Sequence, residues 1–344
     1  MNKIKTAPIE KWYRRIGRVS VGAVLFLILV GGIVRSTGSG MGCPDWPKCF
    51  GVLVPPTDVA DIPAQFFEQH PDYQTKTFNV FQTWTEYINR LIGALIGLFV
   101  LITAVLSIGF FRKDRRIPIL SFGAVILTGF QGWLGKLVVD KNLEGGMVTI
   151  HMLVAMIILA VLITAVYFAE MHRKGGPARS YNVSSGFAWL SVAMLSLTLI
   201  QILIGTQVRE AVDAVAVAMN DTGRETWVDQ LGGYYSIHRS LWIVVAGLIV
   251  YWTRKLIRDP AGNPRMRFFA YVLLATLGLE VLMGMFLGSF ALPAVAQPIH
   301  LLLAAVMFAA EYALVVNVLG IERFGHKQMK LEYHANRQLA NAKQ

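Results

Sequence analysis

Long apolar runs dominate the pattern of this 344-residue chain. Each run has about 17–25 residues with few charges, which is the length an α-helix needs to cross the hydrocarbon core of a bilayer. Short polar segments separate the runs. The pattern therefore predicts an all-α integral membrane protein with eight transmembrane helices, at 18–34, 87–110, 117–138, 149–169, 185–207, 235–255, 267–288 and 298–319.

A polar motif stands at the start of the second run. It places a carboxylate, an amide and a guanidinium within five positions, as Glu86, Asn89 and Arg90. Spacings of three and four residues put these side chains on one helix face. A near copy at the start of the sixth run has Tyr235 in place of Glu86 and His238 in place of Asn89. Ionisable groups in a membrane helix are costly unless they face the protein interior, so both motifs indicate functional positions.

The chain also repeats itself at a fixed distance. The offset of 149 positions that separates Asn89 from His238 recurs in other pairs: His151 with His300, Arg90 with Arg239, Gly129 with Gly278, Gln131 with Glu280 and Gly135 with Gly284. The first run matches the fifth at an offset of 174, pairing Gly31 with Gly205 and Arg35 with Arg209. Four helices in each half give the halves one orientation, so we expect two parallel-repeat four-helix bundles side by side.

Composition and charge agree with a membrane location. Hydrophobic residues make up 55% of the chain and charged residues 15%, with a net charge of +11. The basic residues gather before the first helix and in every second loop, which is the positive-inside pattern and places both termini in the cytoplasm. A basic membrane-facing surface explains this distribution better than a nucleic-acid partner does. The clusters are Lys3, Lys5, Lys11, Arg14, Arg15 and Arg18; Arg112, Lys113, Arg115 and Arg116; Arg173, Lys174 and Arg179; and Arg254, Lys255, Arg258, Arg265 and Arg267.

The start of the chain predicts the membrane in which it resides. The first apolar run is too long for a cleavable signal peptide and has no small-residue cleavage site, so we interpret it as the first helix. No long Arg- and Ser-rich presequence precedes it, which favours a bacterial plasma membrane over a mitochondrion. We expect an N-terminal half over 1–180, a C-terminal half over 181–322 and a cytoplasmic tail over 323–344.

The first outer loop, 36–85, is long and rich in glycine, proline and aromatic residues. Loops of this length in a compact domain are usually functional. The only two cysteines, Cys43 and Cys49, fall within it, on the side of the membrane where oxidation is permitted. A disulfide and a pair of free thiols are both compatible with this placement.

Histidines mark a second constellation. The second, fourth, sixth and eighth helices all descend from the outer side, so the special positions near their starts belong to the outer half of the membrane: Asn89, His151, His238 and His300. Two histidines that face each other from helices of one bundle are a common way to hold a haem through both axial positions. His238 and His300 meet that requirement, and a pair at equal depth favours iron ligation over a simple hydrogen-bonding role.

Four arginines lie at the same depth. Haem propionates are anionic, and a guanidinium can pair with them bidentately at the polar edge of a bilayer. Arg209 and Arg239 could serve a haem in the second half, and Arg35 and Arg90 one in the first. Arginines that extend to lipid phosphate are the alternative.

The first half differs from the second in a way that favours a reaction site. It keeps His151 but has Asn89 where the repeat predicts histidine, and an amide is a poor iron ligand. A haem there should be held from one side, with its open face near Glu86. A salt bridge with Arg90 or capping of the helix is the alternative role for Glu86. Glu280 is either a functional intramembrane carboxylate or a structural hydrogen-bonding group.

These motifs resemble the haem A synthase family over almost the whole chain. The resemblance is most specific in three segments: Gly31-Gly32-Ile33-Val34-Arg35-Ser36-Thr37-Gly38-Ser39-Gly40 followed by Cys43-Pro44-Asp45-Trp46-Pro47-Lys48-Cys49; Glu86 to Gly93; and Ile237-His238-Arg239. The family is built as two four-helix halves. Many members have a second histidine where this chain has Asn89.

The resemblance implies an enzyme that oxidises the C8 methyl of haem O to a formyl group by two hydroxylations, which makes haem A for terminal oxidases. It implies a b-type haem on His238 and His300 that relays electrons, a substrate haem at His151, catalysis by Glu86, and paired loop cysteines at Cys43 and Cys49. The expected partners are haem O, O2 and membrane lipid. Haem O synthase, an electron donor and further copies of the chain are candidates.

Two other classes of function fit the same residues. One is a non-catalytic b-type cytochrome that carries electrons from a quinol, which should tolerate Glu86→Gln. The other is a haem transporter or chaperone, with which the parallel repeat is compatible. The replacement of Glu86 by Tyr235 in the second copy argues for asymmetry and so for a reaction site in the first half.

Overall fold

The computed structural model describes residues 7–73, 77–140, 146–173, 185–258 and 264–319. This part of the chain is helical and contains no β-strand. Its α-helices are α1 (Pro8–Ser36), α2 (Ala64–Gln69), α3 (Val80–Ser107), α4 (Arg116–Asp140), α5 (Met147–Arg173), α6 (Ser185–Ala218), α7 (Gly232–Arg258), α8 (Pro264–Ser289) and α9 (Ala296–Leu319). All of these except α2 are long and apolar enough to cross a membrane, which confirms the all-helical prediction with eight candidate spans.

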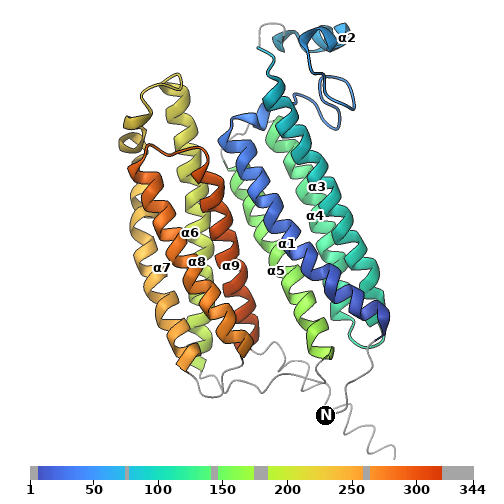
Figure 1. The fold of residues 1–344 in the computed structure, drawn as a ribbon, viewed down its shortest axis with the longest axis vertical. Helices are drawn as coiled ribbons and strands as arrows, with labels where there is room; N and C mark the ends of the chain where they lie inside the picture. Colours follow the sequence, from blue (N-terminus) through green and yellow to red (C-terminus); the bar gives the residue numbers. More distant parts are fainter. Residues whose placement is uncertain (1–6, 74–76, 141–145, 174–184, 259–263, 320–344) are drawn as a thin grey trace, which may run out of the picture.

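The eight long helices form two groups (Figure 1). Helices α1, α3, α4 and α5 pack together, and so do α6, α7, α8 and α9. Helix α9 also packs against α1 and α5, and α5 against α6, so the groups share a continuous contact. Buried apolar side chains fill this contact, among them Leu159 on α5 and Phe308 on α9. The expected boundary between 180 and 181 and the expected tail 323–344 lie outside the described residues.

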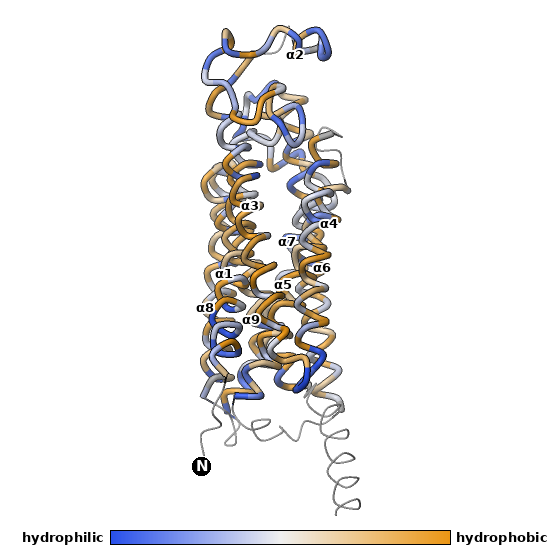
Figure 2. Tube along the Cα trace, turned by 90° about the vertical axis from the view of Figure 1, so that its right-hand side faces the viewer, coloured by the Kyte–Doolittle hydropathy of each residue, from blue (hydrophilic) through white to orange (hydrophobic). Residues whose placement is uncertain are grey.

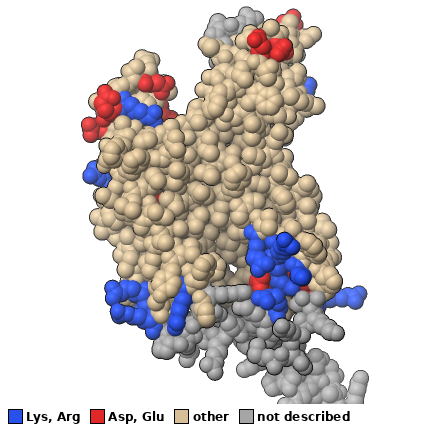
Figure 3. Space-filling view, in the orientation of Figure 1, with Lys and Arg blue, Asp and Glu red and all other residues tan. Residues whose placement is uncertain are grey.

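Apolar and charged positions separate along the length of the molecule. Hydrophobic positions follow the helices, whereas hydrophilic positions concentrate at their ends and in the segment that carries α2 (Figure 2). On the face drawn in Figure 3, most visible Lys and Arg side chains gather at the end where α1 begins, and most visible acidic side chains lie at the opposite end. On this face the belt between the two ends shows almost no charged side chains, as expected of a membrane-spanning protein.

The first helix begins earlier than its apolar run predicts. It starts at Pro8, so four of the basic residues expected to precede it lie inside it: Lys11, Arg14, Arg15 and Arg18. Proline is favoured in the first helical turn because its φ is already helical and its missing N–H is not needed there. Glu10 is buried and pairs with Arg14 at 3.9 Å and with Lys113, so local ion pairs accommodate charge where hydropathy alone predicts a loop.

Two further boundaries differ on the outer side. Helix α3 starts at Val80, where the Asn79 side chain accepts a hydrogen bond from the backbone N–H of Gln82 at 3.2 Å, so the first outer loop ends before 85. Helix α6 continues to Ala218, past the predicted end at 207. Its extension is held by packing of Val212 against Trp227, which lies in the 3₁₀ segment Arg224–Gln230. Apolar periodicity cannot locate such ends because capping and packing decide them.

Candidate functional site

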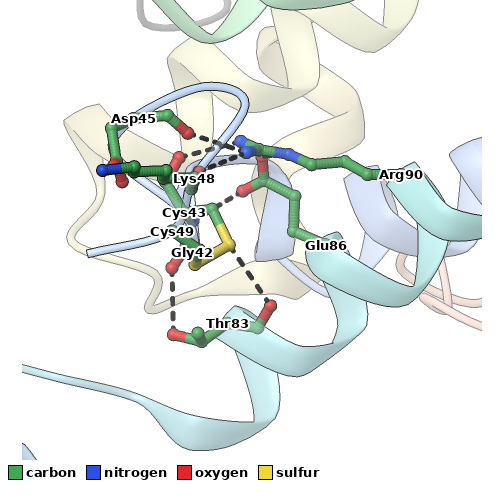
Figure 4. Close-up of polar contacts among 8 residues, drawn as sticks. All are labelled: Gly42, Cys43, Asp45, Lys48, Cys49, Thr83, Glu86 and Arg90. Atoms are coloured by element: carbon green, nitrogen blue, oxygen red, sulfur yellow. Dashed lines mark hydrogen bonds and ion pairs between the residues drawn. A yellow bond between two sulfur atoms is a disulfide. The ribbon is translucent and has the colours of Figure 1, made fainter. Parts of the chain in front are cut away.

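Glu86 lies in the second turn of α3 with its side chain only 4% exposed (Figure 4). Its Oε2 accepts a hydrogen bond from the backbone N–H of Cys43 at 2.8 Å. Its Oε1 accepts from Nε and Nη2 of Arg90 at 3.2 and 2.5 Å. Both oxygens are therefore oriented, one by the outer loop and one by the next turn of its own helix. The salt bridge that the sequence offered as an alternative is present.

Arg90 connects α3 to the outer loop. Its Nη1 donates to the backbone oxygens of Asp45 at 2.7 Å and Lys48 at 3.0 Å, and its Nη2 donates to that of Cys43 at 3.0 Å. Charge-assisted hydrogen bonds of this kind are stronger than neutral ones. The guanidinium of Arg90 therefore faces loop carbonyls here, and its expected role towards a propionate stays a prediction.

The loop itself is closed and seated closely on α3. Cys43 and Cys49 form a disulfide, which confirms one of the two possibilities left by the sequence. The hydroxyl of Thr83 donates to the backbone oxygen of Gly42 at 2.9 Å. A Cβ at Gly42 would lie 2.4 Å from the backbone oxygen of Gln82, so only glycine permits this approach. The loop thus forms a rigid cover over the turn of α3 that carries Glu86.

His238 and His300 face each other in the second group of helices. His238 lies in the second turn of α7 and His300 in the second turn of α9. Their ring centres are 6.4 Å apart and the ring planes are inclined at 85°. Each ring approaches a glycine on a neighbouring helix: a Cβ at Gly205 would lie 3.1 Å from Cε1 of His238, and one at Gly284 would lie 3.4 Å from Cε1 of His300.

This separation fits one metal ion held between the rings. Two imidazoles that bind one ion from opposite sides, each through a nitrogen about 2 Å from it, have ring centres roughly 6 Å apart. Within the described residues no cluster of three or more His, Cys, Asp or Glu side chains could hold a bare ion. The haem expected between these two rings stays a prediction.

The first group of helices has a single histidine at the corresponding positions. His151 lies in the second turn of α5, and the side-chain amide of Gln131 donates to its backbone oxygen at 2.9 Å. Its Nδ1 and the Oδ1 of Asn89 are both buried without a hydrogen-bond partner. Buried polar atoms in native proteins are nearly always satisfied, so a ligand or water is expected at each of these two atoms. The same holds for the Nδ1 atoms of His238 and His300, which also lack a hydrogen-bond partner. Asn89 lies in the third turn of α3, one turn deeper than predicted.

Two of the four expected arginines share one carboxylate. Nε and Nη2 of Arg35 donate to Oδ2 of Asp213 at 3.2 and 2.8 Å, and Nη1 of Arg209 lies 2.6 Å from Oδ1. Nη2 of Arg209 also donates to the backbone oxygen of Arg35 at 3.3 Å. Both guanidiniums can therefore hold a carboxylate at the outer edge between the groups. Arg239 is exposed beside His238.

Sequence reasoning missed two acidic residues. Asp213 follows Arg209 by one helical turn, a spacing that could have indicated an ion pair had α6 been predicted to extend so far. Glu311 is fully buried on α9, and both its carboxyl oxygens lack a hydrogen-bond partner. A carboxylate inside the apolar run 298–319 was the signal for Glu311.

Comparison with known proteins places the chain among relatives of one kind. A family model described as cytochrome oxidase assembly protein (COX15-CtaA) matches residues 14–311. A protein named heme A synthase from Alkalihalophilus pseudofirmus is 29% identical over 201 residues, covering 58% of this chain and 60% of the relative. One of the same name from Shewanella oneidensis is 27% identical over 214 residues, covering 62% of each chain. Another from Cereibacter sphaeroides is 27% identical over 286 residues, covering 74% of this chain and 68% of the relative. The chain thus spans about six tenths of the length of the first two.

Proposed function

The chain belongs to the cytochrome oxidase assembly protein family, and on that basis we propose that it is a membrane oxidoreductase that converts haem O to haem A. The curated relatives named heme A synthase support this activity. The observation that carries the proposal is the family match over residues 14–311. The facing rings of His238 and His300, with centres 6.4 Å apart, support a haem in the second half.

In the proposed arrangement His238 and His300 hold a resident b-type haem. Such a haem, when bound, supplies one-electron transfer. Gly205 and Gly284 let the neighbouring helix backbones approach the histidine rings, which fixes the rings in place. Arg209 and Arg239 are proposed partners of the haem propionates. Arg209 forms an ion pair with the carboxylate of Asp213, so its guanidinium is placed to bind a carboxylate, which supports that role.

The substrate haem O is proposed to bind in the first half, with His151 on one side and Asn89 on the other. Because the Asn89 amide is a weak ligand, the substrate keeps one accessible face. Arg35, which already binds a carboxylate, is the proposed propionate partner, together with Arg90. The unpartnered atoms of His151 and Asn89 support a ligand at this place.

The reaction oxidises one methyl carbon in two hydroxylations. Each consumes one O2, two electrons and two protons, inserts one oxygen atom into a C–H bond and releases one water. The gem-diol formed by the second hydroxylation then loses water to give the aldehyde. Glu86 is the proposed catalytic carboxylate, because its oxygens are buried and oriented at the edge of this half. It can deliver protons or stabilise positive charge at the methyl carbon.

The orientation proposed in the membrane follows the charges. The end rich in Lys and Arg would face the cytoplasm of a bacterial cell, with both termini there. The disulfide-closed loop and the two histidine sites then lie towards the outer face, where oxidation is permitted. The helices α4 and α8, and α5 and α9, begin 148 and 149 residues apart, which supports the parallel repeat.

The direct test is expression in cells that make haem O but lack haem A. Membrane haems would be extracted and identified by chromatography and mass, with empty vector as the control. Haem A, or the hydroxylated intermediate, is the expected result. Abundant haem-loaded protein with haem O unchanged would instead favour an electron-carrying b-type cytochrome, a function that the His238–His300 pair also suits.

A further inference from the structure

His151, His238 and His300 are the three candidate iron ligands. Among these three, only His300 has a carboxylate oxygen at ion-pair distance from a ring nitrogen. Oε1 of Glu280 on α8 lies 3.2 Å from Nδ1 of His300 on α9. Both side chains are largely buried, at 14% and 24% exposed. Gly284 follows Glu280 by one helical turn and contacts the same ring, so two positions on one face of α8 fix the imidazole.

A side-chain amide contacts each of the other two histidines, at the backbone oxygen and not at the ring. Gln131 donates to the backbone oxygen of His151, and Gln201 donates to that of His238, each at 2.9 Å. By hydrogen-bond geometry the Nδ1 of all three rings is buried without a partner, and His300 differs from the other two by the carboxylate oxygen at ion-pair distance. Gln131 occupies the repeat position of Glu280, so the same place in the two halves carries an amide in one and a carboxylate in the other.

We propose that Glu280 is a positioning residue that accepts the Nδ1–H of His300 and thereby fixes this histidine as a strong axial ligand. This inference rests on the proposed haem site of the second half. A neutral imidazole has one N–H, so a carboxylate that accepts it at Nδ1 leaves Nε2 as the free electron pair for a metal. The contact between the two side chains is at ion-pair distance without the alignment of a full hydrogen bond.

The chemical consequence is electronic as well as geometric. A histidine hydrogen-bonded to a carboxylate is a more basic ligand, which favours the more highly charged oxidised iron. Glu280 therefore lowers the reduction potential of the resident haem and makes it a stronger electron donor. A glutamine in its place keeps the size of the side chain, yet its amide is a weaker acceptor for the Nδ1–H.

The test is redox titration of the purified, haem-loaded Glu280→Gln protein. The variant is expected to keep its haem, because both histidines remain. The ratio of reduced to oxidised haem at a fixed ambient potential should rise about tenfold, which for one electron is an upward shift of ~59 mV. The low-spin electron paramagnetic resonance signal should move as well, since it reports the axial field of the imidazoles.

Glu311→Gln is the matched control, because Glu311 is another buried carboxyl on the same helix as His300 but about 16 Å away along its axis. It should leave the potential and the resonance signal unchanged. An unchanged potential in Glu280→Gln, or an equal shift in Glu311→Gln, would overturn the positioning role.

The His300→Ala variant distinguishes a wrong role for Glu280 from a wrong haem site. If His300→Ala loses the haem while Glu280→Gln matches the wild type, the ligand stands and only the role of Glu280 is wrong. If His300→Ala retains the wild-type haem spectrum, the haem site itself is wrong.

Discussion

In the second half of the molecule, His238 and His300 face each other with ring centres 6.4 Å apart. At the repeat positions of the first half the chain has one histidine, His151, and Asn89 in place of the other. One of the two glycine pairs differs between the halves. A Cβ at Gly205 would lie 3.1 Å from the His238 ring, whereas one at its counterpart Gly31 would meet nothing within 4 Å. In the other pair, a Cβ at Gly135 or Gly284 would lie 3.7 or 3.4 Å from the histidine ring of its own half. The halves therefore differ by one histidine ring and by the close packing at Gly205.

This difference explains how one repeated scaffold can serve two purposes. A closely packed pair of strong ligands suits a group that stays bound, because every contact that fixes the rings also slows release. A single histidine suits a group that must enter, react and leave. Only the first half has a carboxylate at the place of Glu86, because the repeat position carries Tyr235. The predictions below test this division, from the largest expected effect to the smallest.

The largest effect is expected at the histidine pair. His238→Ala and His300→Ala should each remove the resident haem completely, because an iron held from two sides loses half of its protein ligands. Haem content per protein, measured by the pyridine haemochrome spectrum, checks this. His151→Ala is the first-half control and should keep the resident haem. An equal loss of haem from all three variants would contradict the proposal that only the second half holds the resident haem.

Glu86→Gln is expected to lower haem A formation about 100-fold or more, which is the usual contribution of a positioned acid–base group. Resident haem should stay at the wild-type level, because Glu86 lies in the other half. Product is measured by chromatography of extracted haems. Tyr235→Phe, at the repeat position, should leave product formation intact. A normal yield from Glu86→Gln would remove this carboxylate from the mechanism.

Arg90→Gln should lower product formation about tenfold, the equivalent of one lost hydrogen bond to a charged group. The cause would be indirect, since the variant removes the contacts of Arg90 with the loop carbonyls and with Glu86. Amide hydrogen exchange over residues 42–49 should become faster in the same variant. Arg239→Gln is the control at the repeat position and should leave this exchange unchanged. Lost activity with unchanged loop exchange would point to direct contact with substrate.

The smallest effect is expected from Gly205→Ala. Its Cβ would lie 3.1 Å from the His238 ring, so the ring must shift by a few tenths of an ångström, at a cost of about 1 kcal/mol. A displaced absorption band and slightly weaker haem retention are the expected observations. Gly31→Ala, at the repeat position, should change neither the spectrum nor the folding. A larger defect in Gly31→Ala would show that the first half is the more closely packed one.

Hydropathy was sufficient to predict the spans, because the cost of burying polar backbone in lipid forces long helices. The disulfide partners could be named because the chain has only two cysteines. Helix ends were predicted less well. Ion pairs around Glu10, the Asn79 cap and the packing of Val212 extend three helices beyond their apolar runs.

The residues of the candidate site could be predicted where they occupy repeated positions in the sequence. Contacts between residues that are not related by the repeat could not be predicted. The pairing of His238 with His300 follows from equal depth and a common offset. The contacts of Arg90 with loop carbonyls depend on how the outer loop folds, which no periodicity encodes. Asp213 stands between two arginines that are 174 positions apart in the sequence, so only the packed structure reveals their shared partner.

That shared partner has a consequence for how the two halves communicate. Asp213 is a single counter-ion for Arg35 and Arg209, one from each half. An anionic group that binds either arginine must compete with Asp213, and the released carboxylate then pairs more fully with the other. If an anionic ligand binds one of these arginines, it would therefore change the affinity at the other, and thermodynamic linkage would make this coupling equal in both directions.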